Sequence, residues 1–174
     1  MIRKATEKDI LTIAKLYDDI IDFQNANGSF MSWIKGVYPT KATADEALKL
    51  DTLYVYDLNG FVFGSVILDC IQPKEYTSIK WQTASDTRPA LIVHTLCVDP
   101  EHMGLGIASE MLSYAKKLAQ QLNCSSIRLA TNSKNIGAIH LYEKNDFTIV
   151  GYDKVLLDGK ISCPRQCFME HIIK

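Results

Sequence analysis

The chain has 174 residues, of which 47% are hydrophobic and 22% are charged. This length predicts one domain, spanning residues 1–174, with enough buried surface to fold without a disulfide or a metal. A formal net charge of −1 provides no general basic field, so we expect neither nucleic acid nor an anionic membrane as a partner.

The N-terminal sequence and the cysteine pattern predict a protein of the reducing cytoplasm. Residues 1–7 lack the apolar core of a secretory leader, and no apolar run approaches the roughly 18 residues of a membrane span. Five cysteines form an odd set without a CxxC pair. Cys163 and Cys167 are four apart, but no His-x-His or second pair is near, and structural zinc needs about four such ligands. We therefore expect reduced thiols, a cytoplasmic location and no metal.

The N-terminal part predicts a short strand followed by an amphipathic helix. The strand covers residues 2–5, and Thr6 has the character of an N-cap, with Glu7 and Asp9 in the first turn of the helix. Apolar residues then recur at spacings typical of a helix and share one face. The polar sequence at 25–28 ends this helix.

A second, shorter helix is predicted over residues 43–50, before a β-hairpin. Two β-rich runs, at 53–57 and 61–68, flank Asn59-Gly60, which is a strong signal for a tight hairpin turn. Residues 70–89 contain two prolines and several polar residues, which indicates a long connection.

The rest of the chain alternates strands and helices. Strands are predicted at 90–98, 126–131, 147–157 and 161–172, helices at 107–122 and 135–144, and a second hairpin turn at 158–159. The order β-α-α-β-β-β-α-β-α-β-β predicts an α/β (α+β) fold, in which helices flank a mixed central sheet of about six to seven strands.

The most informative segment, at 96–109, contains a strand end, a proline turn, a glycine-rich loop and a helix start. A helix N-terminus carries unpaired amides and about half a positive charge, so it suits a pyrophosphate. Gly104 and Gly106 would let the backbone approach a phosphate without a clash. A glycine-softened turn into an ordinary amphipathic helix would give the same local pattern.

Two other nucleotide-binding patterns do not fit this segment. The dinucleotide fingerprint requires a third glycine where Ser109 stands, and the strand at 126–131 ends without the acidic ribose ligand. The Walker phosphate loop requires a Gly-Lys-Ser/Thr sequence, which does not follow the glycines.

Two segments carry a family resemblance. Val98-Asp99-Pro100 is followed by Met103-Gly104-Leu105-Gly106-Ile107-Ala108, and the run from Asn132 to Phe147 contains Ala138-Ile139-His140-Leu141-Tyr142. They resemble motif A (Q/R-x-x-G-x-G/A after a V-x-P turn) and motif B (N-x-x-A-I-x-L-Y-x-x-x-G-F) of the GNAT superfamily of acetyl-CoA-dependent N-acetyltransferases. Met103 replaces the usual Gln or Arg. Asp146 replaces the glycine before Phe147, at a position that we expect to be left-handed.

The resemblance implies a site for acetyl-CoA. The pyrophosphate would lie on the amides of the motif A loop and the pantetheine beside the preceding strand, where the Leu96 amide would polarise the thioester carbonyl. Asn135 would hydrogen-bond the coenzyme, and Tyr142 would act as general acid toward the sulfur, although a buried Tyr is usually only part of a core. The implied coenzyme-binding residues are Leu96, Cys97, Val98, Met103, Gly104, Leu105, Gly106, Ile107, Ala108, Ser109, Asn135 and Tyr142.

His94 is the candidate general base, because residues 128–131 on the strand before motif B include no carboxylate. In a regular strand His94, Leu96 and Val98 share one face, and two residues span about 6–7 Å. A neutral imidazole can accept the proton of an attacking amine near neutral pH. A structural histidine bonded to the backbone is an equal alternative.

Aromatic side chains are candidates for binding the acceptor. Trp33, Tyr38 and Trp81 lie in regions that line the acceptor cleft in the family, and aromatic rings suit amine-bearing substrates. They are equally suited to core or lid packing. Three aspartates near the end of the first helix could bind a cation, but a solvated helix face is the default.

The sequence thus predicts direct transfer of the acetyl group from acetyl-CoA to a primary amine of a small molecule. No cysteine has a base placed beside it, and Cys97 is expected to be buried opposite His94, so no acetyl-enzyme is required. One alternative is an acyl-CoA-binding sensor without turnover. Another is transfer to a peptide or protein N-terminus or lysine. A homodimer is an open expectation.

Overall fold

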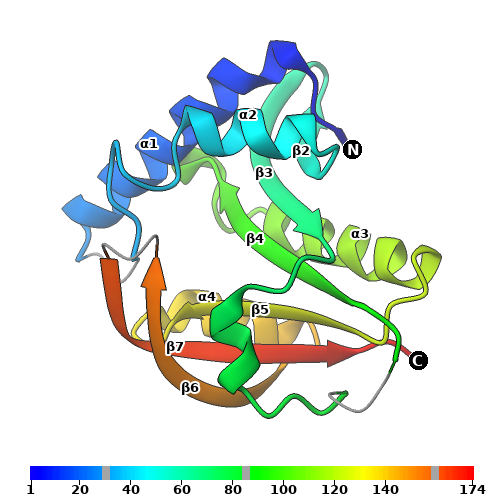
Figure 1. Cartoon of the computed structure of the whole chain (residues 1–174). Coiled ribbons are helices and arrows are strands. Elements are labelled where there is room, and N and C mark those ends of the chain that lie inside the picture. Colours follow the sequence, from blue (N-terminus) through cyan, green and yellow to red (C-terminus); the bar gives the residue numbers. More distant parts are fainter. Residues whose placement is uncertain (29–31, 84–86, 158–160) are drawn as a thin grey trace. The chain divides into compact units, whose positions relative to one another are not determined.

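The computed structural model describes residues 1–28, 32–83, 87–157 and 161–174, except the side chains of 155–157 and 161–164. Its helices and strands are β1 (Ile2–Lys4), α1 (Ile10–Ala26), α2 (Lys41–Lys49), β2 (Leu53–Leu58), β3 (Phe61–Asp69), β4 (Ala90–Val98), α3 (Ile107–Gln121), β5 (Ser126–Asn132), α4 (Ile136–Lys144), β6 (Thr148–Leu157) and β7 (Ile161–Ile172) (Figure 1). Short 3₁₀ turns lie at Glu7–Asp9, Lys74–Ser78 and Pro100–His102. The predicted element order is confirmed, while the hairpin turn predicted at 158–159 lies outside the described residues.

The strands hydrogen-bond in the order β1-β2-β3-β4-β5-β7-β6. β2 is antiparallel to β1 and β3, β4 is parallel to β5, and β7 is antiparallel to β5 and β6. The sheet is therefore mixed, which confirms the predicted α/β class. By contacts the chain forms two compact units, and both β4 and α3 contribute to each of them.

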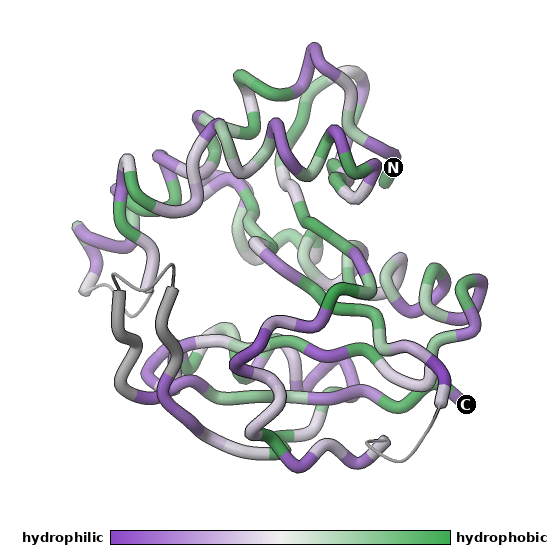
Figure 2. The backbone as a smooth tube through the Cα atoms, viewed as in Figure 1, coloured by the Kyte–Doolittle hydropathy of each residue, from purple (hydrophilic) through white to green (hydrophobic). Residues whose placement is uncertain are grey.

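Unit one contains β1, β2, β3 as far as Leu68, α1, α2, β4 from His94 onward and α3 as far as Tyr114. Thr6 begins the first helical segment as predicted, since its N–H donates to the Asp9 carboxylate at 2.7 Å. The first turn is a 3₁₀ turn, so α1 begins only at Ile10. Apolar and polar residues alternate along α1 (Figure 2), and its buried residues are Ile10, Ile13, Leu16, Tyr17, Ile20 and Ile21.

The second helix and the hairpin of unit one follow from local backbone chemistry. α2 begins at Lys41, two residues before its predicted start, because Thr40 forms a capping box with Thr43. Asn59 and Gly60 have φ values of 55° and 86°, which is the left-handed conformation of a type I′ turn. The predicted hairpin is therefore confirmed.

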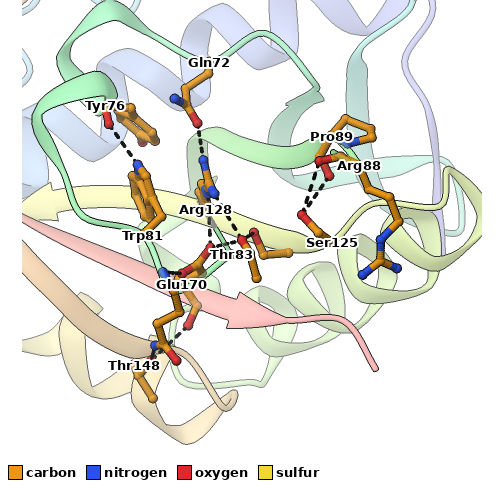
Figure 3. Close-up of polar contacts among 12 residues, drawn as sticks. Gln72, Tyr76, Trp81, Thr83, Arg88, Pro89, Ser125, Arg128, Thr148 and Glu170 are labelled. Atoms are coloured by element: carbon orange, nitrogen blue, oxygen red, sulfur yellow. Dashed lines mark hydrogen bonds and ion pairs between the residues drawn. The ribbon is translucent and has the colours of Figure 1, made fainter. Parts of the chain in front are cut away.

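Unit two is built on the ladder of β5, β7 and β6, with β4 contributing Ala90–Ile92 beside β5. A cluster of apolar side chains fills its interior, namely Tyr76, Trp81, Ile92 and Phe168. Beside it Arg128 of β5 binds Glu170 of β7, and Gln72 and Thr83 of the β3–β4 connection join this polar network (Figure 3). Side-chain hydrogen bonds therefore help to hold the described part of this connection to β5 and β7.

Among the helices in these described ranges, none combines the length and the apolar character that a membrane span requires. The described side chains also include no group of three or more His, Cys, Asp or Glu residues that could hold a metal ion.

Candidate functional site

The turn between β4 and α3, in unit one, is fixed by Asp99. Its carboxylate accepts a hydrogen bond from the Glu101 N–H at 3.0 Å and lies 2.9 Å from Nδ1 of His102. The Asp99 N–H donates to the Phe63 carbonyl at 2.9 Å, and the rings of Phe63 and His102 contact each other at a tilt of 39°, with centroids 4.1 Å apart. The entry to the glycine-rich loop is thereby tied to the neighbouring strand β3.

Gly104 and Gly106 are required by backbone conformation. Their φ values are 80° and 86°, a region that side-chain-bearing residues rarely adopt. A Cβ atom at either position would meet no other atom within 4 Å, so these glycines face open space. The left-handed backbone, and not a close contact with a neighbouring atom, therefore requires glycine at both positions.

The start of α3 offers backbone amides to an anion. The Glu110 N–H donates to the Gly106 carbonyl at 3.0 Å, and the amides of Ile107 and Ala108 precede this bond in the first turn. The run from Met103 to Ser109 contains no Lys or Arg, and Glu110 is acidic. Amides and the helix dipole would therefore hold a pyrophosphate here without side-chain cations.

β4 is interrupted beside the predicted catalytic residues. Thr95 has a φ of 43°, which is a backbone outlier for a β-branched residue. A regular strand would place His94 and Leu96 about 6–7 Å apart. Because the positive φ of Thr95 lies between them, this spacing does not apply here. Exposure still alternates here, because His94, Leu96 and Val98 are partly exposed whereas Thr95 and Cys97 are buried.

A group of buried polar atoms lies behind this strand, and sequence reasoning missed it. The hydroxyls of Tyr17 and Thr95 are buried and have no hydrogen-bond partner of normal geometry among the residues that the structure describes. The Ser65 hydroxyl lies 3.2 Å from Sγ of Cys97. Burial raises the pKa of Cys97 to about 11, although Ser65 acts in the opposite direction. The helical spacing of Tyr17 indicated core packing, and no sequence signal marks the backbone of Thr95.

The motif B segment lies on α4 in unit two. Asn135 is the N-cap of α4, and its Oδ1 accepts a hydrogen bond from the Ala138 N–H at 3.2 Å. Tyr142 is 8% exposed, and burial raises the pKa of its phenol to about 12. Asp146 has a φ of 63°, so the expected left-handed position is confirmed, and its carboxylate pairs with Lys116 at 2.9 Å.

The three aromatic candidates for the acceptor site differ in their surroundings. Trp33, in unit one, is half-buried and meets the ring of Tyr17 edge-on at 6.5 Å. Tyr38, also half-buried, closes a tight turn with Ile34 by backbone hydrogen bonds.

Trp81, in unit two, is only 5% exposed. Its Nε1 donates to the Tyr76 carbonyl at 2.8 Å, and the Arg128 guanidinium stacks on its ring at 4.5 Å. Of the two alternatives open for Trp81, core packing describes this position.

Residues 22–147 match the model of the acetyltransferase (GNAT) family. The chain belongs to the acetyltransferase (GNAT) family. The matched range contains every residue that the sequence assigned to the coenzyme, to catalysis or to the acceptor, from Trp33 to Tyr142. It covers GNAT motifs A and B, so the resemblance inferred from those motifs is confirmed.

Similar proteins support this membership. The chain is 29% identical over 97 residues to streptothricin acetyltransferase from Escherichia coli, a match that covers 56% of this chain and 52% of that one. The chain thus spans about half the length of this relative. A GNAT family acetyltransferase from Streptococcus agalactiae has a TM-score of 0.81 at 20% identity, covering 100% of this chain and 95% of the other. At these identities the solved structures establish the GNAT fold.

A second solved structure is a Salmonella typhimurium protein assigned as an acetyltransferase, with its cofactor acetyl-CoA. Its TM-score is 0.72 at 16% identity, with coverage of 100% of this chain and 94% of that one.

Proposed function

We propose that this GNAT protein transfers the acetyl group of acetyl-CoA to a primary amine of a small molecule. The observation that carries the proposal is the loop of Gly104 and Gly106, whose backbone is left-handed and which leads directly into the free amides at the start of α3. Membership of the family supports the reaction class, and the structural neighbour with acetyl-CoA supports the coenzyme. The relative named for streptothricin supports a small-molecule acceptor.

In this proposal each part of the chain has one role. The amides of Met103 to Ser109 bind the pyrophosphate, while Leu96, Cys97 and Val98 of β4 lie along the pantetheine, toward which Asn135 donates its side-chain amide. When bound, acetyl-CoA supplies an activated thioester. The Leu96 N–H stabilises the negative charge that develops on the carbonyl oxygen.

Two proton transfers complete the proposed reaction. His94 accepts a proton from the acceptor amine as its nitrogen forms a bond to the acetyl carbon, and Tyr142 donates a proton to the departing coenzyme thiolate. His94 and Leu96 belong to unit one and Tyr142 to unit two. The family resemblance supports assigning all three to one thioester.

Direct transfer is favoured over an acetyl-enzyme. Cys97 is the cysteine nearest in sequence to the proposed thioester position, but it is 4% exposed. With its pKa raised to about 11 by burial, its thiol stays protonated at neutral pH. A protonated, buried thiol is a poor nucleophile, so the amine itself attacks the thioester.

The experiment is a coenzyme A release assay with acetyl-CoA and a panel of polyamines, aminoglycosides, amino acids and N-terminal peptides. We expect at least one small amine to release coenzyme A in proportion to acetylated product. In Tyr142→Phe, turnover should fall by about 10²- to 10⁴-fold with coenzyme affinity retained.

Tyr152→Phe, which alters an exposed tyrosine of β6, is the matched control and should retain activity. Binding of acetyl-CoA without release for any amine would favour a sensor, and release only with peptides would favour a protein acceptor.

A further inference from the structure

Two thiols that play no part in the proposed transfer lie side by side in unit two. Sγ of Cys70 is 3.9 Å from Sγ of Cys124, although the residues are 54 apart in sequence. Cys70 is exposed, at the start of the β3–β4 connection, whereas Cys124 is fully buried before β5. A disulfide bond needs about 2.05 Å between the sulfurs, so closing this pair requires a movement of about 2 Å.

Cys124 is held in place by its backbone neighbours. Its own N–H donates to the Ala119 carbonyl at 2.8 Å at the end of α3. The next N–H, of Ser125, donates to the Pro89 carbonyl at 2.8 Å, and the Ser125 hydroxyl also lies close to Pro89 and Arg88 (Figure 3). The Cys124 thiol therefore has a defined position, from which it can attack a mixed disulfide formed at Cys70.

Cys70 stands where the chain leaves β3. Asp69, the last residue of β3, accepts the Ile71 N–H through Oδ1 at 2.9 Å, and Gln72 accepts a hydrogen bond from Arg128. The segment around Cys70 is thus anchored on both sides, while its sulfur is accessible to small reagents in solution. One exposed thiol and one buried thiol at van der Waals distance form the arrangement in which a reversible disulfide can close.

We propose that Cys70 and Cys124 are a reversible redox modification site, oxidised to an intramolecular disulfide by a low-molecular-weight disulfide. The Cys70 thiolate attacks one sulfur of the reagent, forms a mixed disulfide and releases the other half, which takes up a proton. The Cys124 sulfur then displaces the remaining half from Cys70 and loses its own proton to it. In total, two protein thiols and one small disulfide give one protein disulfide and two small thiols.

The position of the pair predicts what oxidation does. Burial first, and then the neighbouring Cys70, raises the pKa of Cys124 to about 12, so the exposed thiol is the one that reacts with the reagent. The new bond ties the start of the connection to Cys124, two residues before β5, and closes a long loop. Such a cross-link restricts the unfolded chain, so the oxidised protein should melt roughly 5–10 °C higher.

The test treats the full-length protein with oxidised glutathione. Digestion without reductant, followed by mass spectrometry, should yield a cross-linked peptide pair containing Cys70 and Cys124, lighter by two hydrogens than the separate reduced peptides. The melting temperature should rise in parallel, and dithiothreitol should reverse both changes. Neither measurement depends on acetyl transfer, so the outcome is independent of the proposed function.

Matched variants separate the pair from other thiols. Cys70→Ser changes an exposed position, so it should fold normally, yet show neither the peptide pair nor the shift in melting temperature. Cys163→Ser should retain both. A persistent glutathione adduct on Cys70, a cross-link that involves other cysteines, or thiols that stay reduced in the wild-type protein would each overturn the proposal.

Discussion

The Arg128 guanidinium donates to the Glu170 carboxylate at 3.1 Å, and the two side chains are 8% and 0% exposed. Glu170 also accepts hydrogen bonds from the Gln82 N–H at 2.7 Å and from the Thr83 hydroxyl at 2.6 Å. Burial raises the pKa of Glu170, but these hydrogen bonds outweigh it and leave the pKa below its usual value. The carboxylate therefore stays ionised and links β5 and β7 to the β3–β4 connection.

Removing one partner of this pair should be strongly destabilising. Arg128→Met leaves the Glu170 charge buried without its cation, so we expect the free energy of unfolding to fall by about 3–5 kcal/mol in urea denaturation. Arg165→Met is the matched control, because Arg165 stacks on Tyr152 at 4.4 Å, much as Arg128 stacks on Trp81 at 4.5 Å, but is exposed. It should lose no more than about 1 kcal/mol. Equal losses would mean that burial of the charge is not the decisive factor.

Asp9 makes the free energy of unfolding of unit one change with pH in the acid range. Hydrogen bonds from Arg3 lower the pKa of Asp9 to about 2, helped by Thr6 and opposed by burial. Because the folded pKa lies below the unfolded value of about 3.9, the stabilisation is complete above that value and is lost as the pH falls through about 2. The stability gap between wild type and Asp9→Asn should therefore narrow as the pH falls from 6 toward 3.

Denaturant unfolding at several pH values would measure this gap. Asp45→Asn is the control, since Asp45 forms an exposed pair with Lys41 one helical turn away and should change stability little. A gap for Asp9→Asn that stays constant across this pH range would contradict the role assigned to the carboxylate.

The local features of the fold were predictable where one residue type determines the backbone. The Asn59-Gly60 turn, the helix start after Thr6 and the left-handed Asp146 all follow from short-range chemistry. The conformation of Thr95 did not follow, because β-branched residues favour regular strands and only the surrounding structure imposes a positive φ. The pairing of Arg128 with Glu170 joins residues 42 apart and left no pattern in the sequence.

The candidate site was predictable to a similar degree. Motif spacing located the glycine loop and the helix that carries Tyr142, because both depend on local sequence. For Trp81 the sequence left open whether the ring binds acceptor or fills the core, since the two uses require the same side chain. The Cys70–Cys124 pair depends on tertiary structure alone.

The coenzyme loop can be tested through backbone strain. Gly106→Ala places a Cβ at a φ of 86°, so the loop must rearrange and we expect acetyl-CoA affinity to fall by about tenfold, given roughly 1–2 kcal/mol for this conformation. Gly60→Ala is a close control, because Gly60 has the same φ of 86° but lies in the β2–β3 turn. Isothermal titration should show that Gly60→Ala loses stability and retains affinity. If the two variants bind acetyl-CoA equally well, the loop is not the pyrophosphate site.

The last prediction concerns His94, the proposed base. An imidazole nitrogen with a free lone pair accepts the amine proton in the proposed step, so removing the imidazole should slow that step. With limiting amine, His94→Ala should lower turnover by about 10²- to 10⁴-fold, while acetyl-CoA still raises the melting temperature, because the glycine loop is intact. His140→Ala is the control, since His140 is an exposed residue of α4, and it should leave turnover unchanged. If His94→Ala keeps the wild-type turnover, proton transfer passes instead through water or another side chain, and His94 is only a structural residue of β4.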